Sequence, residues 1–172
     1  MDALEAIATK LDIRQFAKKR VDNNIKKKIL EAARLTGSSM NSQHWRFILV
    51  HDPKSLATLA GDSSSGPWVR GADFAVIINI DPKIPGSLID AGRSGQDMQV
   101  AAWSQGVASG IFTGIRAGEL RRDFGIPDNL NPVAVIGFGY PRKKMVGRKK
   151  RKPLSEVAYL EKFGNPIGNL GD

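Results

Sequence analysis

Residues 74–80 read FAVIINI, a run in which six of the seven side chains are apolar. A strand with so little alternation between polar and apolar side chains needs cover on both of its faces. A second run of this kind, VAVIGF, occupies residues 133–138 and ends at Gly139-Tyr140-Pro141. Two such strands predict a layered domain in which helices pack on a sheet.

The spacing of apolar residues around these two strands predicts the remaining elements. The expected helices cover residues 2–10, 22–36, 55–60, 88–105, 117–124 and 154–163, and the expected strands 45–50 and, as a strand or extended segment, 111–115. Several helices follow one another directly, so the pattern favours an α+β fold over a regular βαβ series. The segment GDSSSGP at 61–67 is expected to be flexible because of its composition.

The chain has 172 residues, no cysteine and two histidines. This length is typical of one domain, and we expect 1–172 to form a single domain. The lack of cysteine excludes disulfides and catalytic thiols, and two separate histidines do not support a histidine-based metal site. The first ten residues lack a signal-peptide pattern, and no apolar stretch approaches the length of a membrane span, so we expect a cytoplasmic protein without membrane contact.

The net charge of +9 is concentrated in one segment. Residues 142–152 read RKKMVGRKKRK, with eight cations and no acid, whereas the rest of the chain has 18 basic and 17 acidic residues. Three interpretations of this run stay open: a solvated loop, a nucleic-acid contact, and a pocket for one phosphorylated ligand. The run has no interleaved aromatic residues, which argues against stacking on single-stranded nucleic acid.

The general catalytic motifs are missing from the sequence. It contains no GxGxxG after a strand, no GxxxxGK[ST], no HExxH and no GxSxG. His44 and His51 flank an expected strand and are interpreted as ordinary loop or strand-end residues. Asp123 and Asp128 lie near turns and helix ends, where acids commonly act as caps. We therefore expect any redox chemistry to depend on a bound cofactor.

Several segments, taken in order, resemble the FMN-dependent nitroreductase family. They are KLDIRQF at 10–16, SSMNSQHWRF at 38–47, DAG at 90–92 with Gln96, Ala101-Ala102 and Gly106 after it, FGIP at 124–127 with VAVIGFGYP at 133–141 after it, and RKPLSEV at 151–157. Each motif is weak alone, and their shared order over nearly the whole chain carries the resemblance.

The resemblance implies a three-layer α+β fold, in which helices flank a central and mostly antiparallel sheet. It also implies an intertwined homodimer with two FMN sites at the interface. The segment DAG to Gly106 would form the central dimer helix, along which Ile89, Gly92, Gln96, Val100 and Trp103 form one stripe. The small residues of that helix permit close packing.

By the same resemblance, three groups of residues would bind FMN. Basic residues would hold the phosphate and the ring edge, a polar loop would reach the cofactor of the partner subunit, and a segment after the central helix would line the ring near N5. The implied positions are Lys10, Asp12, Arg14, Ser38, Ser39, Asn41, Phe112, Thr113, Gly114, Lys149 and Arg151. Lys10, Lys149 and Arg151 match phosphate positions, and Arg14 matches a position near the pyrimidine edge.

Two residues depart from the family pattern. Asp12 stands where the family usually has Ser, and a carboxylate beside a phosphate is repulsive unless a cation intervenes. Asp12 is therefore expected to pair with Lys10 or Arg14, or to bind a ribityl hydroxyl. His44 replaces the usual Pro before Trp45, and we expect it to lie at the surface.

The resemblance implies an FMN-dependent NAD(P)H oxidoreductase. It would reduce nitroaromatic, quinone or similar electron-poor acceptors by ping-pong hydride transfer through flavin N5, with NADH or NADPH as donor. Three alternatives stay open. The same fold could carry another flavin reaction, such as flavin fragmentation or dehalogenation, or bind flavin without turnover. A basic nucleic-acid-binding domain would instead use residues 142–152.

Overall fold

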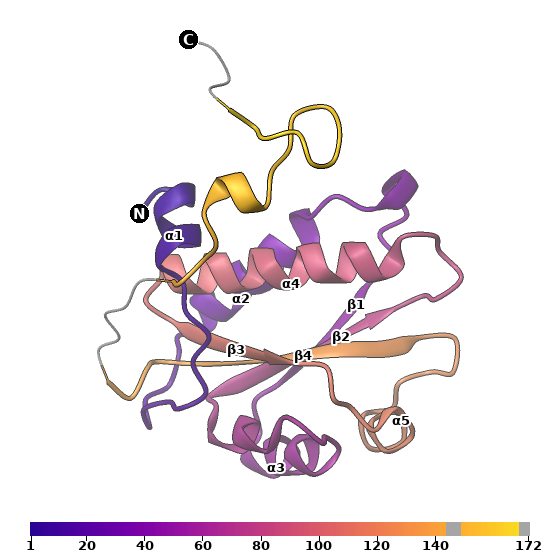
Figure 1. Ribbon diagram of the computed structural model, residues 1–172. Helices are drawn as coiled ribbons and strands as arrows, with labels where there is room; N and C mark the ends of the chain where they lie inside the picture. Colours follow the sequence, from indigo (N-terminus) through magenta and orange to yellow (C-terminus); the bar gives the residue numbers. More distant parts are fainter. Residues whose placement is uncertain (144–148, 169–172) are drawn as a thin grey trace.

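The computed structural model describes residues 1–143 and 149–168, and these form three layers (Figure 1). The middle layer is an antiparallel sheet in the order β1 (Arg46–Val50), β2 (Phe74–Ile80), β4 (Asn131–Gly139) and β3 (Ala108–Phe112). One face carries α1 (Ala3–Thr9), α2 (Asn23–Leu35) and α4 (Ser87–Ser104), and the other carries α3 (Pro53–Gly61) and α5 (Ala117–Phe124). The predicted three-layer α+β fold is confirmed.

The apolar run at 74–80 forms the centre of the molecule. Every residue of β2 is buried, and successive side chains enter opposite cores. Val76 and Ile78 belong to the core beneath α2 and α4. Ala75 and Ile77 belong to the core above α3 and α5. The two-sided burial predicted from the sequence follows from the position of β2 between two strands and between two helical layers.

Helix α4 lies across the upper face of the sheet and buries only one of its sides. Ala91, Met98 and Ala102 are among its buried residues. On its other side Leu88 is 67% exposed, Ile89 is 69% exposed, and Gly92 and Gln96 are also exposed. Part of the stripe predicted from the sequence thus forms an outer face that the described residues of this chain leave uncovered.

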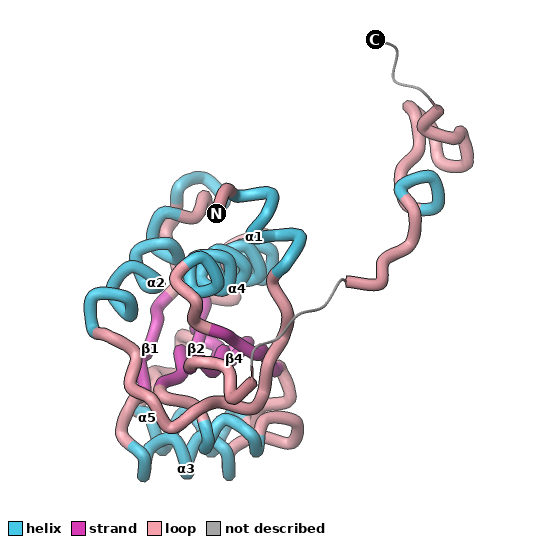
Figure 2. Tube along the Cα trace, turned by 90° about the vertical axis from the view of Figure 1, so that its left-hand side faces the viewer, coloured by secondary structure: helices cyan, strands magenta, loops and turns pink. Residues whose placement is uncertain are grey.

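The helix predicted over 154–163 is wrong. The structure has only a short 3₁₀ turn, Leu154–Glu156, and then turns in which Tyr159 pairs with Pro166. Figures 1 and 2 show this segment running away from the three layers. Its apolar residues therefore lie outside both cores of the described residues, so a helix there would lack stabilising packing, and Leu154 and Phe163 are 65% and 90% exposed.

Two other elements differ in detail from the sequence predictions. Strand β3 covers Ala108–Phe112 and not 111–115, because residues 108–112 pair with β4. The segment 61–67 is fixed by hydrogen bonds, including Ser64 N to Gly114 O at 2.9 Å, and Pro67 begins a 3₁₀ turn. None of the helices within residues 1–143 and 149–168 has the length and hydropathy needed to cross a membrane.

Candidate functional site

A pocket of about 680 Å³ opens between the end of α1, the outer side of α4 and the chain at 149–151. Its lining is strongly basic, with Asp12 as the acid among its residues. The lining residues are Lys10, Leu11, Asp12, Gly92, Gln96, Gln99, Ile111, Lys149, Lys150 and Arg151. The structure thus brings together the three predicted phosphate residues, although Lys10 and Lys149 are 139 positions apart in the sequence.

Lys10 and Asp12 form an ion pair at the inner wall of this pocket. Lys10 Nζ lies 2.7 Å from Asp12 Oδ1, and the lysine side chain is only 8% exposed. Gln99, from α4, donates to the same carboxylate oxygen at 3.3 Å and to Ser109 Oγ at 3.1 Å. The expectation that Asp12 pairs with a neighbouring cation is confirmed. Sequence reasoning missed Gln99 and Ser109, because neither belongs to a motif.

Lys149 closes the pocket from the other side. It is half-buried, and its ammonium donates to the backbone carbonyl of Ile7 in α1. Burial lowers the pKa of Lys149, the positive charges of Lys10 and Arg151 lower it further, and Asp12 opposes them. The pocket therefore holds more positive charge than its own acid balances, which is the electrostatic condition for binding an anion.

Arg14 faces a neighbouring cavity of about 290 Å³, which it shares with Asp12, Pro141 and Arg142. Its guanidinium carbon lies 5.8 Å from the ring centroid of Trp68. Gly110 makes this arrangement possible, because a Cβ there would come within 2.8 Å of Ile13 O and 2.9 Å of the Trp68 ring. Arg14 is thus held against an aromatic ring, beside the basic pocket and outside its lining.

The segment after β3 is anchored to the 61–67 loop. Phe112 is buried and packs edge-on against Trp68, with ring centroids 5.6 Å apart, whereas Thr113 is exposed. Gly114 N donates to Ser65 Oγ at 3.2 Å. The Gly114 N–H is therefore already bonded within the chain, and the exposed polar group of the segment is Thr113.

The predicted polar loop lies at the opposite end of α4 from the Lys10–Asp12 pair. Ser39 N donates to Asp90 Oδ2 in the first turn of α4 at 2.8 Å. Gln99, which contacts Asp12, follows nine residues later, about 14 Å along the helix axis. Within one chain the structure does not bring Ser38, Ser39 and Asn41 together with the Lys10–Asp12 pair.

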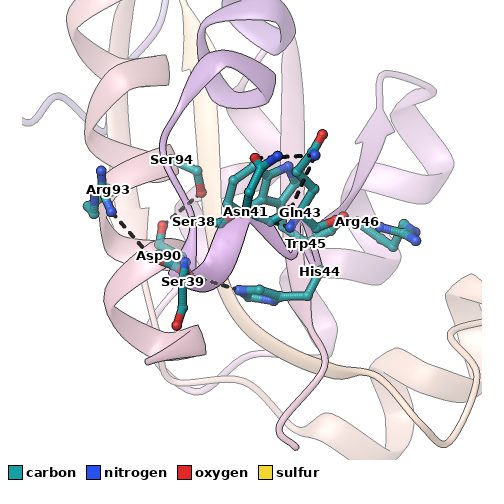
Figure 3. A network of polar contacts seen from close by, with 11 residues as sticks. Ser38, Ser39, Asn41, Gln43, His44, Trp45, Arg46, Asp90, Arg93 and Ser94 are labelled. Carbon is teal, nitrogen blue, oxygen red and sulfur yellow. Dashed lines mark hydrogen bonds and ion pairs between the residues drawn. The ribbon is translucent and has the colours of Figure 1, made fainter. Parts of the chain in front are cut away.

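The same loop has an unusual backbone. Met40, Asn41 and Gln43 have φ values of 51°, 53° and 47°, in the left-handed region that non-glycine residues seldom adopt. Such residues cost about 1–3 kcal/mol each and persist where surrounding contacts impose them. Ser38 Oγ accepts from Gln43 N at 3.0 Å, and Gln43 Nε2 donates to Asn41 Oδ1 at 3.3 Å (Figure 3).

His44 is not at the surface, so the expectation of a surface role is wrong. Its side chain is 3% exposed, and Nε2 lies 3.2 Å from Asp90 Oδ2 (Figure 3). The observed partner that holds it inward is Asp90, in the first turn of α4. The sequence offered one signal that was not used: Asp90 is an acid in the first turn of a helix whose inner side is otherwise uncharged.

The basic run divides between the pocket and the surface. Lys149 and Arg151 line the pocket, while Arg142 and Lys143 are exposed at the edge of the Arg14 cavity. The remaining cations that the sequence left unassigned, Lys144 and Arg148, lie outside the described residues.

Comparison with known proteins agrees with this fold. The nitroreductase family model matches residues 7–81 and 62–140. A protein of Methanothermobacter thermautotrophicus named "Putative NADH dehydrogenase/NAD(P)H nitroreductase" is 34% identical over 172 residues, covering 95% of this chain and 88% of its own length.

Solved structures share the fold. The crystal structure of "a putative nitroreductase in complex with FMN" from Desulfovibrio desulfuricans is 27% identical, has a TM-score of 0.84, and is matched over 95% of this chain and 98% of its own. An "FMN-dependent Nitroreductase" from Clostridium difficile is 22% identical, with a TM-score of 0.83 over 90% of this chain and 96% of its own. By sequence and by fold, the chain belongs to the nitroreductase family.

Proposed function

We propose that this protein is an FMN-dependent NAD(P)H oxidoreductase that reduces nitroaromatic, quinone or similar electron-poor acceptors in a ping-pong sequence. When bound, FMN would supply the chemistry of hydride transfer between NADH or NADPH and the acceptor. Family membership supports this class of reaction, and so do the names of the relatives. The chain then has to bind the flavin, orient it and adjust its charge.

The observation that carries the proposal is the excess positive charge of the 680 Å³ pocket. A phosphate dianion would offset the mutual repulsion of Lys10, Lys149 and Arg151, which now contributes to the lowered pKa of Lys149. Arginine can bind phosphate in bidentate fashion, and lysine acts as a point charge. The residues present therefore fit the phosphate of FMN.

Asp12 and Arg14 have different tasks in this proposal. The Asp12 carboxylate is 56% exposed and already bonded to Lys10 and Gln99, so it can accept a hydrogen bond from a ribityl hydroxyl. Arg14 would hold a positive charge where negative charge develops on the flavin ring during reduction. Phe112, Thr113 and Gly114 would line the ring, with Thr113 as their exposed polar residue.

We further propose that two chains form an intertwined homodimer. Leu88 and Ile89 leave an apolar outer side on α4, and the segment after Arg151 exposes Leu154, Val157 and Phe163. A partner chain would cover both surfaces. It would also bring its own Ser38, Ser39 and Asn41 to the pocket that one chain lines with Lys10 and Arg151.

An absorbance spectrum of the purified protein tests the central claim. We expect a yellow protein with flavin bands that bleach when NADH or NADPH is added without oxygen, and recover when an acceptor follows. A colourless protein that does not take up added FMN would refute the proposal. Identification of the products separates acceptor reduction from flavin fragmentation or dehalogenation on the same fold.

A further inference from the structure

A buried acid–imidazole pair connects the residues just before β1 to α4, away from the basic pocket. His44 Nε2 lies 3.2 Å from Asp90 Oδ2, and the two side chains are 3% and 4% exposed. Burial of such a pair is unfavourable unless further hydrogen bonds satisfy it. The remaining contacts of Asp90 therefore indicate what the pair does.

Asp90 is shared between three partners. Its Oδ2 accepts from His44 and also from the backbone N–H of Ser39 at 2.8 Å, while Arg93 Nη1 approaches Oδ1 at 3.4 Å (Figure 3). Burial acts to raise the pKa of Asp90, but the Ser39 N–H, His44 and Arg93 together keep it below its usual range. The carboxylate is thus ionised and can only accept hydrogen bonds.

This charge state fixes the proton on His44. Because Asp90 can only accept, Nε2 of His44 must carry the hydrogen that points to it. Nδ1 is buried and has no hydrogen-bond partner among the described residues. Within residues 1–143 and 149–168 the imidazole therefore has one polar contact, its bond to Asp90, and through Asp90 it reaches Ser39.

Helix α4 also holds the start of the loop at further points. Thr36 Oγ1 is hydrogen-bonded to Asp97, and Arg93 lies so close to Gly37 that a Cβ there would come within 2.5 Å of its guanidinium. Between these contacts and His44 the chain passes through the left-handed residues Met40, Asn41 and Gln43. A backbone of this kind requires contacts on both sides of the loop, and Asp90 supplies the one at Ser39.

We propose that His44 is a positioning residue: through Asp90 it fixes the Ser39 backbone, and thereby the conformation in which loop 38–43 presents Ser38, Ser39 and Asn41 to the flavin site of the partner subunit. The inference rests on the proposed function for its flavin part. Its loop part, the dependence of Ser39 on His44, does not need a flavin and can be measured separately.

The first test compares FMN affinity in four proteins, at a temperature where circular dichroism shows all of them folded. They are the wild type, His44→Phe, His44→Gln and the control His51→Gln, which changes the exposed second histidine. We expect His44→Phe to raise the Kd for FMN about tenfold or more, because Asp90 loses a donor while the bulk of the side chain is kept. His44→Gln keeps a side-chain N–H and should stay within about threefold of wild type, as should His51→Gln.

A purely structural role predicts a different pattern. If the ring is needed only for packing, His44→Gln will bind FMN as weakly as His44→Phe, and this result would overturn the proposal. Equal affinity of His44→Phe and wild type would overturn it too.

The second test measures hydrogen exchange at the Ser39 amide without FMN. We expect protection in the wild type and His44→Gln, and about tenfold faster exchange in His44→Phe. Unchanged exchange in His44→Phe would refute the loop part. A wild type that does not bind FMN refutes the proposed function and the flavin part, while the exchange rates still decide the loop part.

Should His44→Phe not fold, Asp90→Asn carries the same test. This variant keeps the shape of the side chain and an acceptor for Ser39, but removes the negative charge that holds the Ser39, His44 and Arg93 donors. We expect faster exchange at Ser39 and weaker FMN binding, and wild-type values for both would overturn the proposal.

Discussion

Lys10 Nζ lies 2.7 Å from Asp12 Oδ1, and the buried ammonium thereby has an exposed carboxylate as its counter-ion. This pair occupies the wall of the pocket to which we assign the flavin phosphate. An anion that binds this ammonium must share its positive charge with Asp12. A change at Asp12 should therefore alter the affinity for FMN more than the affinity for riboflavin, which has no phosphate.

Replacement of Asp12 by Asn should strengthen FMN binding. The change removes one negative charge beside the phosphate and leaves Lys10 free to bind it, so we expect the Kd to fall about three- to tenfold at low salt. Riboflavin affinity should change less. Fluorescence titrations with both flavins measure the effect, and weaker FMN binding by Asp12→Asn would show that the carboxylate is itself a necessary ligand.

Replacement of Arg151 by Gln should weaken FMN binding about tenfold or more, because a hydrogen-bonded charge at the phosphate is lost. The adjacent Lys152 provides a matched control, since it lies outside the pocket lining and has a 73% exposed side chain. Lys152→Gln removes the same charge one residue away and should have little effect. Equal losses in the two variants would mean that only the overall charge of the segment matters.

The Asp90 contacts predict loss of stability in acid. The pKa of Asp90 is lower in the folded protein than in the unfolded chain, despite the opposing effect of burial, because of the bonds from Ser39 and His44. The stabilisation is then complete above the unfolded pKa of about 3.9 and is lost as the pH falls through the folded pKa.

Thermal unfolding between pH 7 and pH 2.5 measures this effect. The wild type should lose Tm steeply below about pH 4, and Asp90→Asn should lose less over the same range. The difference between the two Tm values should be largest near neutral pH. A constant difference down to pH 2.5 would contradict the assignment of an ionised Asp90.

The outer side of α4 predicts the oligomeric state. In light scattering we expect the wild type to have twice the 18.7 kDa mass of the chain. Ile89→Glu should shift the mass toward a single chain, because it places a charge in the centre of the proposed interface. Lys28→Glu adds the same side chain at an exposed position of α2 and should leave the mass unchanged. A wild type of single-chain mass would disprove the dimer.

The sequence was most informative where one element determines its own environment. The run at 74–80 is apolar on both sides of the strand, and its burial between two layers follows directly. Prediction was poorer where a neighbouring element determines the structure of a segment. Ala108, Ser109 and Gly110 have little preference for strands, but β4 pairs with them, so β3 begins three residues before the predicted segment. Residues 154–163 have a helical pattern, yet they belong to neither core that the described residues form.

In the candidate site, too, some residues could be predicted from local sequence and others depend on the fold. Lys10 and Arg151 could be grouped because motifs in the sequence carry them, and Lys149 because it lies two residues before Arg151; all three line one pocket. Gln99 and Ser109 could not, because ordinary residues become important only where the fold aligns α4 with β3. The position of His44 depends on a single acid in another element, Asp90, which no local pattern connects to it.

The outward course of the chain after Arg151 has a consequence for how the protein behaves on dilution. In the dimer we propose, a second molecule covers the exposed side chains of Leu154, Val157 and Phe163. The stability of the folded protein then rises with protein concentration, just as it would rise with the concentration of a bound ligand. Folding, assembly and flavin retention then form one linked equilibrium. Dilution should lower Tm and release FMN together, whereas added FMN should hold the two chains in one particle.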